Sequence, residues 1–268
     1  MSASSGRPWA QAGLIVRKEL LELRRSPLLL LSMSSLPATV VVVPVALFAW
    51  LAHAAPPQAL YFLQDLYKVS PAGGPVGALA EVLAKNWLPM FLVLPIFLPI
   101  LLAAQSIGGE RERRTLEPLL ATPISTTSII LGKSLAALVP AIAITWIAAA
   151  VFCLGVDVVA WPHLHVLALP DFAWVFATVV LAPLLALFGN ALAVVVSARV
   201  LDPRAAQNIA ATTVVPLLGL LVVQLAGRIS LGPAFYLAFA LGAALADVAL
   251  IWLAVRWFDR EELLTRWR

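Results

Sequence analysis

Charged side chains that could act together are concentrated in one stretch of the chain, residues 108–125. Both charge signs alternate between Glu110 and Glu117, accompanied by leucines and prolines. Such a segment can present its charges to a soluble partner while its leucines pack against the rest of the protein. A solvated loop that only fixes the direction of the chain has the same composition, so composition alone leaves both interpretations open.

Two other patterns resemble binding motifs but lack necessary parts. Gly132-Lys133-Ser134 matches the end of a phosphate-binding loop, which also needs a glycine five residues before Gly132, where this chain has Thr127. His163 and His165 lie between two acidic residues and could ligate a metal ion, but histidines in a proline-containing loop more often face water. We therefore expect no nucleotide, no metal ion and no catalytic residue in this chain.

Three of the polar residues inside apolar runs could carry a function or join helices. Asp247 is the only acidic one, and a carboxyl group at membrane depth costs about 3 kcal/mol unless it faces protein or water. It could line a substrate path or couple to a cation, and it could equally form a structural hydrogen bond between helices or be a protonated carboxyl group. For Asn190 and Gln224 we expect interhelical hydrogen bonds.

The chain that positions these residues is unusually apolar. Of 268 residues, 62% are hydrophobic and 12% are charged, with a mean hydropathy of +0.97; a soluble domain is about 45–50% apolar and about 25% charged. An ordinary soluble enzyme and a disordered chain are thereby excluded, and an integral membrane protein is indicated. Six apolar runs can each cross a hydrocarbon core of about 30 Å: residues 28–52, 87–107, 129–156, 172–198, 209–226 and 233–255.

The runs are continuous rather than alternating, which predicts helices and not a barrel. We expect an all-α integral membrane fold with a cytoplasmic N-terminus at 1–27, six transmembrane helices at 28–257 and a cytoplasmic tail at 258–268. Only three of the 18 basic residues fall on the predicted outer side, namely Lys68, Lys85 and Arg228. The positive-inside rule therefore places both termini in the cytoplasm of a multi-pass protein of the plasma (cytoplasmic) membrane.

Before the first span, residues 9–25 form an amphipathic pattern with a helical period. At 100° per residue one face carries the apolar residues Trp9, Val16, Leu20 and Leu23. The opposite face carries Gln11, Lys18, Glu22 and Arg25, and Arg17 and Arg24 flank the apolar face. This pattern predicts an interfacial helix on the inner leaflet, with a break at Ser26-Pro27 before the first span.

The prolines and tryptophans of the spans each have a simple interpretation. Prolines inside the spans predict hinges or static kinks, and we favour kinks whose freed carbonyls are satisfied by neighbours. Tryptophans near the span ends predict interfacial anchors: Trp50, Trp87, Trp161, Trp174, Trp252 and Trp257. The outer stretch 54–86 predicts two short interfacial segments with a break between them.

Three segments also carry a resemblance to a known family. They are Glu110-Arg-Glu-Arg-Arg-Thr-Leu-Glu-Pro-Leu-Leu-Ala-Thr-Pro-Ile-Ser125 followed by Leu131-Gly132-Lys133, then Arg17-Lys18-Glu19-Leu20 with Arg24-Arg25-Ser26, and residues 258–264. With six spans in the expected rhythm, the whole chain resembles the permease (transmembrane) subunit of a type-2 ABC transporter.

The resemblance implies a subunit without catalysis of its own. Two copies, or one copy and a related permease, would pair in the bilayer, and each would dock a separate ATPase subunit that binds ATP and Mg²⁺. The loop would carry a cytoplasmic coupling helix between spans two and three, with the contacts Glu110, Arg111, Glu112, Arg113, Arg114, Thr115, Leu116, Glu117, Leu119 and Leu120. The N-terminal helix would border the ATPase, and transport would be export.

The alternative is a stand-alone secondary carrier or channel that uses Asp247 as an ion-coupling residue. Such carriers show more ionisable groups at membrane depth, or repeated halves with broken helices, and neither is clear in this sequence. The most elaborate polar chemistry lies in a cytoplasmic loop, which favours a permease driven by a partner. The sequence does not indicate the cargo, and no nucleic-acid partner is expected.

Overall fold

The computed structural model describes residues 8–54, 56, 58, 61, 62, 65, 74–112, 126–199, 203–225 and 231–257. Within these ranges the chain is almost entirely helical, with a short turn at residues 165–171. Six stretches are long and apolar enough to cross a membrane: Leu30–Ala54, Gly74–Leu102, Leu131–Leu164, Phe172–Ser197, Gln207–Gln224 and Pro233–Leu253. The predicted all-α fold with six spans is confirmed.

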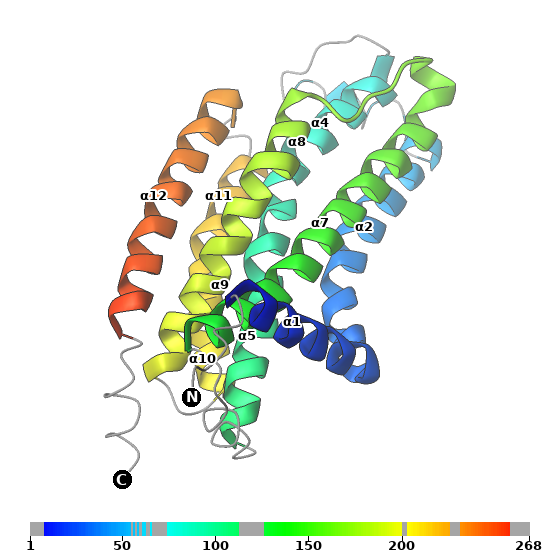
Figure 1. Ribbon diagram of the computed structural model, residues 1–268. Coiled ribbons are helices and arrows are strands. Elements are labelled where there is room, and N and C mark those ends of the chain that lie inside the picture. Colours follow the sequence, from blue (N-terminus) through cyan, green and yellow to red (C-terminus); the bar gives the residue numbers. More distant parts are fainter. Residues whose placement is uncertain are drawn as a thin grey trace, which may run out of the picture.

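The helices follow one another as a bundle with one transverse helix at its end (Figure 1). Their order is α1 (Pro8–Arg25), α2 (Pro27–Ala54), α4 (Gly74–Phe91), α5 (Val93–Glu112), α7 (Thr126–Leu164), α8 (Phe172–Phe176), η1 (Ala177–Leu181), α9 (Ala182–Arg199), α10 (Pro203–Ala211), η2 (Thr212–Val214), α11 (Val215–Leu225) and α12 (Pro233–Trp257). Helices α4, α5 and α9 form the centre, whereas α2, α11 and α12 expose most of their apolar surface.

Helix α1 ends where the sequence predicts a break. The amide of Ser26 donates to the carbonyl of Leu23, and the Ser26 carbonyl accepts from Leu30, so Ser26 ends α1 and begins α2. Pro27 occupies the first position of α2, where its missing N–H and fixed φ suit a helix start. Helix α1 then lies across the end of the bundle and packs mainly against α7 (Figure 1).

The second span begins earlier than its apolar run suggests. Helix α4 starts at Gly74, which has φ of 70°, and not near Trp87. Glu81 and Lys85 interrupt the apolar run, but they pair with each other one turn apart on an exposed face. Hydropathy alone therefore starts the span too late, and residues 74–86 belong to the bundle instead of to an outer loop.

Proline explains the two irregularities inside spans two and four. Helix α4 stops at Phe91 and α5 starts at Val93, because Pro95 has no N–H to donate to the Phe91 carbonyl. In span four, the amide of Ala182 donates to Ala177 in a π-helical turn, and Pro183 cannot donate to Thr178. The Thr178 carbonyl accepts instead from the indole Nε1 of Trp146 on α7, at 2.8 Å.

Two further carbonyls freed by prolines are satisfied by side chains of other helices. Pro44 leaves the carbonyl of Val40 without its helical donor, and Trp87 Nε1 donates to it at 2.9 Å. Pro89 likewise leaves the carbonyl of Lys85 without its helical donor, and Gln224 Nε2 donates to that carbonyl at 2.8 Å. These contacts join α2 to α4 and α4 to α11, which supports static kinks over hinges at these two positions.

Trp174 corrects the predicted belt of interfacial tryptophans. Its side chain is buried in the core, where it lies 5.0 Å from the rings of both Phe91 and Phe152 and its Nε1 donates to the Ala84 carbonyl at 3.0 Å. Its position near a span end made it look like an anchor, but α4 and α7 extend past that level and cover it. Trp50, Trp161 and Trp252 are exposed, as anchors would be.

Replacing Trp87 with phenylalanine should weaken the bundle. Phenylalanine keeps most of the ring contacts but leaves the Val40 carbonyl without the donor that Pro44 also cannot supply. We expect a loss of about 1 kcal/mol, seen as a lower midpoint of thermal unfolding in detergent. Trp50→Phe, at an exposed ring, is the control and should leave the midpoint unchanged; equal midpoints for both variants would contradict the proposed role of Trp87.

Candidate functional site at the α1–α7 junction

The predicted coupling loop lies between the end of α5 and the start of α7. Glu110, Arg111 and Glu112 form the last turn of α5, and the structure describes their backbone but not their side chains. The remaining predicted contacts lie outside the described residues: Arg113, Arg114, Thr115, Leu116, Glu117, Leu119 and Leu120. Both flanking helix ends lie at the end of the bundle that α1 crosses (Figure 1).

Gly132 allows α1 to lie directly on the first turns of α7. A Cβ atom at this position would be 2.7 Å from the Cβ of Ile15 and 3.0 Å from the carbonyl oxygen of Ala12. Only a residue without a side chain permits such a close approach of two helices. The sequence Gly132-Lys133-Ser134, which resembles part of a phosphate-binding loop, is thus used for helix packing.

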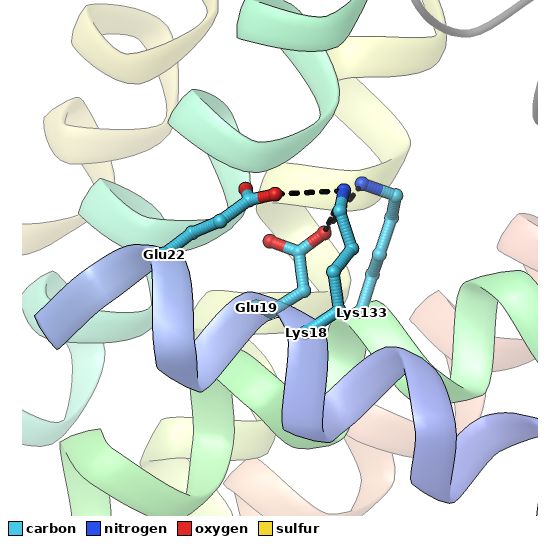
Figure 2. A network of polar contacts seen from close by, with 4 residues as sticks. All are labelled: Lys18, Glu19, Glu22 and Lys133. Carbon is cyan, nitrogen blue, oxygen red and sulfur yellow. Dashed lines mark hydrogen bonds and ion pairs between the residues drawn. The ribbon is translucent and has the colours of Figure 1, made fainter. Parts of the chain in front are cut away.

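An ion pair closes the same junction (Figure 2). Lys133 Nζ lies 3.1 Å from Glu19 Oε1, and the two side chains are only 6% and 13% exposed. Lys18 on the outer side of α1 lies 3.5 Å from Glu19 and 3.3 Å from Glu22. Charges this deeply buried require partners, and the Glu19 carboxylate lies between two cations, Lys133 inside the junction and Lys18 on its outer side.

The face of α1 that meets the bundle differs from the predicted apolar face. The predicted residues Val16, Leu20 and Leu23 are half-buried, whereas Ala12 and Ile15 are fully buried and Glu19 continues the same stripe. The side chain of Trp9 is outside the description. The apolar period of the sequence did not predict this face, because the face contains the acidic residue Glu19. The feature of the sequence that could have indicated a buried acidic partner was Lys133, a single charge at the start of an apolar run.

Asp247 lies on the inward stripe of α12. The buried residues of this helix recur at helical spacing, namely Tyr236, Ala240, Ala243 and Asp247, and α12 packs chiefly against α9. Asp247 is 3% exposed, and neither carboxylate oxygen has a hydrogen-bond partner among the described residues. A structural hydrogen bond between helices, one of the open interpretations, is therefore not formed by Asp247 with any described residue.

The other two polar residues of the spans behave differently from each other. Gln224 makes the interhelical hydrogen bond to Lys85 described above, although its Oε1 is buried without a partner in the described ranges. Asn190 is buried on α9, and its Oδ1 likewise has no partner among the residues described.

The acids near the histidine pair have structural roles. Asp157 Oδ1 accepts from the amides of Ala168 and Leu169 at 2.7 and 3.0 Å, which fixes the turn after α7. Asp171 caps the N-terminus of α8 by accepting from the amide of Trp174 at 2.9 Å. No group of three potential metal ligands occurs among the described residues.

Comparison with known proteins supplies the family. The model of a family described as ABC-2 family transporter protein matches residues 14–235, from α1 to the first turn of α12. The match includes the α1–α7 junction and the loop 108–125, and it ends before Asp247. The chain matches none of the curated proteins with which it was compared.

The family match over most of the chain agrees with the six described helices that are long and apolar enough to cross a membrane, because the family consists of membrane transport components. The chain is a multi-pass membrane protein of the permease type and belongs to the ABC-2 transporter family.

Proposed function

We propose that this chain is the permease subunit of an ATP-driven exporter, which forms the transport pathway as a dimer. A separate ATPase subunit, which binds ATP and Mg²⁺, docks on residues 108–125. The observation that supports this proposal is the α1–α7 junction: the loop with the densest charge returns into a helix start that is tied to α1 by a buried ion pair. A loop that only fixed topology would need no such rigid support.

Helix α1 would lie on the inner leaflet beside the docking site. Its outer side exposes Leu14 and Leu21 together with the basic residues Arg17, Arg24 and Arg25. Leucines alternating with arginines suit a helix at the lipid headgroups of an anionic membrane surface. In this orientation both termini and the loop 108–125 face the cytoplasm, in agreement with the distribution of basic residues.

The test is purification of the tagged chain from native membranes in mild detergent, with mass spectrometry of the proteins that co-purify. A stoichiometric ATPase subunit is the expected result. A single-chain oligomer without an ATPase would overturn the proposal and would favour the stand-alone carrier, in which Asp247 couples to an ion gradient.

Asp247 is expected to lower stability and support transport. A buried carboxyl group without a hydrogen-bond partner is unfavourable by about 1–3 kcal/mol, so Asp247→Leu should raise the midpoint of thermal unfolding. The same substitution should reduce the ATP hydrolysis of the reconstituted complex, and Asp247→Asn should reduce it without a comparable gain in stability. Thermal unfolding and ATPase rates of the two variants check this expectation.

Leu245→Ala is a suitable control, because Leu245 lies on the exposed face of the same helix. It should leave the ATPase rate unchanged. If Asp247→Asn has the ATPase rate and the unfolding midpoint of the unmodified protein, Asp247 has no role in transport.

A further inference from the structure

We propose that Glu19 and Lys133 are positioning residues that make α1 and the first turns of α7 one rigid unit, through which movement of the loop 108–125 reaches α1 and α2. This inference rests on the proposed function, because it assigns a route for the movement that a docked ATPase would impose. The junction itself is independent of that assignment and can be tested without an ATPase.

The junction is rigid because two different kinds of contact meet in it. At Gly132 the two helices approach so closely that a single added carbon would overlap Ile15 and the backbone of Ala12. One residue further, Lys133 reaches Glu19, one helical turn beyond Ile15 on α1. Close packing resists sliding of the helices, and the buried ion pair resists separation, since moving the helices apart would take Lys133 Nζ away from the carboxylate that it contacts at 3.1 Å.

The position of the junction in the chain links it to the loop on one side and to the first span on the other. Helix α7 begins at Thr126, directly after the loop, and reaches Gly132 and Lys133 within its first two turns. On the other side, α1 continues from Glu19 to Arg25 and joins α2 through Ser26 alone. A displacement of the start of α7 is thus passed to α2 with few flexible residues between them.

The first experiment measures the junction in the permease alone. Spin labels are placed at Gly13→Cys, where nothing lies within 4 Å of a Cβ, and at Val139→Cys, which is exposed on α7. The background is Cys153→Ser, because Cys153 is the only cysteine. Labelled chain is diluted with unlabelled chain in lipid nanodiscs, so that only distances within one chain are recorded.

One narrow distance distribution is expected for the unmodified pair. Glu19→Gln and Lys133→Gln should each broaden it, and the charge-swapped double variant Glu19→Lys with Lys133→Glu should restore it. Broadening by the single variants with rescue by the swap supports the pairing. The pairing is overturned if both single variants keep the width of the unmodified distance distribution, or if the distribution of the charge-swapped variant is as broad as that of either single variant. If the single variants do not fold, the width of the swapped protein decides by itself.

The second experiment measures ATP hydrolysis by the complex purified with its ATPase subunit. The single variants should retain the ATPase but lower its rate roughly fivefold, a size typical of residues that carry coupling between sites. The swap should recover the rate to within about twofold. Glu81→Gln removes a charge from the exposed Glu81–Lys85 pair on α4 and serves as the matched control, with an unchanged rate.

The two experiments separate the possible failures. Absence of an ATPase from the purified wild-type protein contradicts the proposed function, while the label distances still decide whether the pair holds the helices together. The distance measurement can also behave as expected while the single variants keep the ATPase rate of the unmodified complex. This result would contradict only the proposed transmission of movement through the junction.

Discussion

Reversal of charge at Glu110, Glu112 and Glu117, each to lysine, should abolish productive contact with the ATPase subunit while the chain still inserts into the membrane. The three substitutions turn a segment of mixed charge into a strongly basic one. A docking surface that is complementary to the glutamates would then face charges of its own sign, which costs several kcal/mol. About 3 kcal/mol of lost contact corresponds to a roughly hundredfold weaker association. The measurements are the stoichiometry of the co-purified ATPase and the ATPase rate of the complex.

The expected loss depends on the place of the charges and not on their number. Glu81→Lys, at the exposed pair of α4, provides a charge reversal away from the loop and should leave the co-purified ATPase at full stoichiometry. Normal coupled transport in the triple variant would show that residues 108–125 are not the docking element. The proposed function would then need another contact surface on the same side of the membrane.

Gly189→Ala should destabilise the bundle strongly, because a Cβ atom at this position meets a closer neighbour than at any other described glycine. A Cβ atom on Gly189 would lie 2.3 Å from the carbonyl oxygen of Ile96 and 3.1 Å from its carbonyl carbon, so the obstacle is the backbone of α5. A backbone cannot move aside as a flexible side chain can, and α5 and α9 form the central packing of the bundle. We expect a loss of about 3 kcal/mol, at the upper end for overpacked cores. Thermal unfolding in detergent measures it.

Gly242→Ala is the matched control, since nothing lies within 4 Å of a Cβ at Gly242 on α12. This substitution should keep the unfolding midpoint or raise it slightly, because alanine favours a helix over glycine. Equal midpoints for Gly189→Ala and Gly242→Ala would show that α5 and α9 can separate without cost. In that case the close approach would not hold the centre of the bundle together.

Hydropathy predicted the spans well because the membrane imposes their length and their helical form. Each apolar run had to become a helix, and the six runs correspond to the six candidate spans. The ends of the spans were less predictable where polar residues continue a helix. Because of Glu81 and Lys85 the predicted second span started too late, since their pairing with each other was not visible in hydropathy.

Local chemistry also predicted the first helix and its end. The amphipathic period of residues 9–25 and the dipeptide Ser26-Pro27 agree with α1 and its junction with α2. The face that α1 buries was not predicted, because an amphipathic pattern orients a helix toward any apolar medium and does not distinguish lipid from a neighbouring helix. The α7 surface at Gly132 decided the orientation.

The sequence by itself determined that this protein spans a membrane with six helices, because a chain of 62% hydrophobic residues with continuous apolar runs has no other stable form. Only the tertiary structure decided which polar groups meet. Glu19 and Lys133 are 114 positions apart, Gln224 and the Lys85 carbonyl 139, and Trp174 and the Ala84 carbonyl 90. Hydropathy depends on each residue alone, whereas these contacts depend on how the helices pack: glycines such as Gly132 allow two helices to approach closely, and prolines such as Pro89 free carbonyls that side chains of other helices then bind.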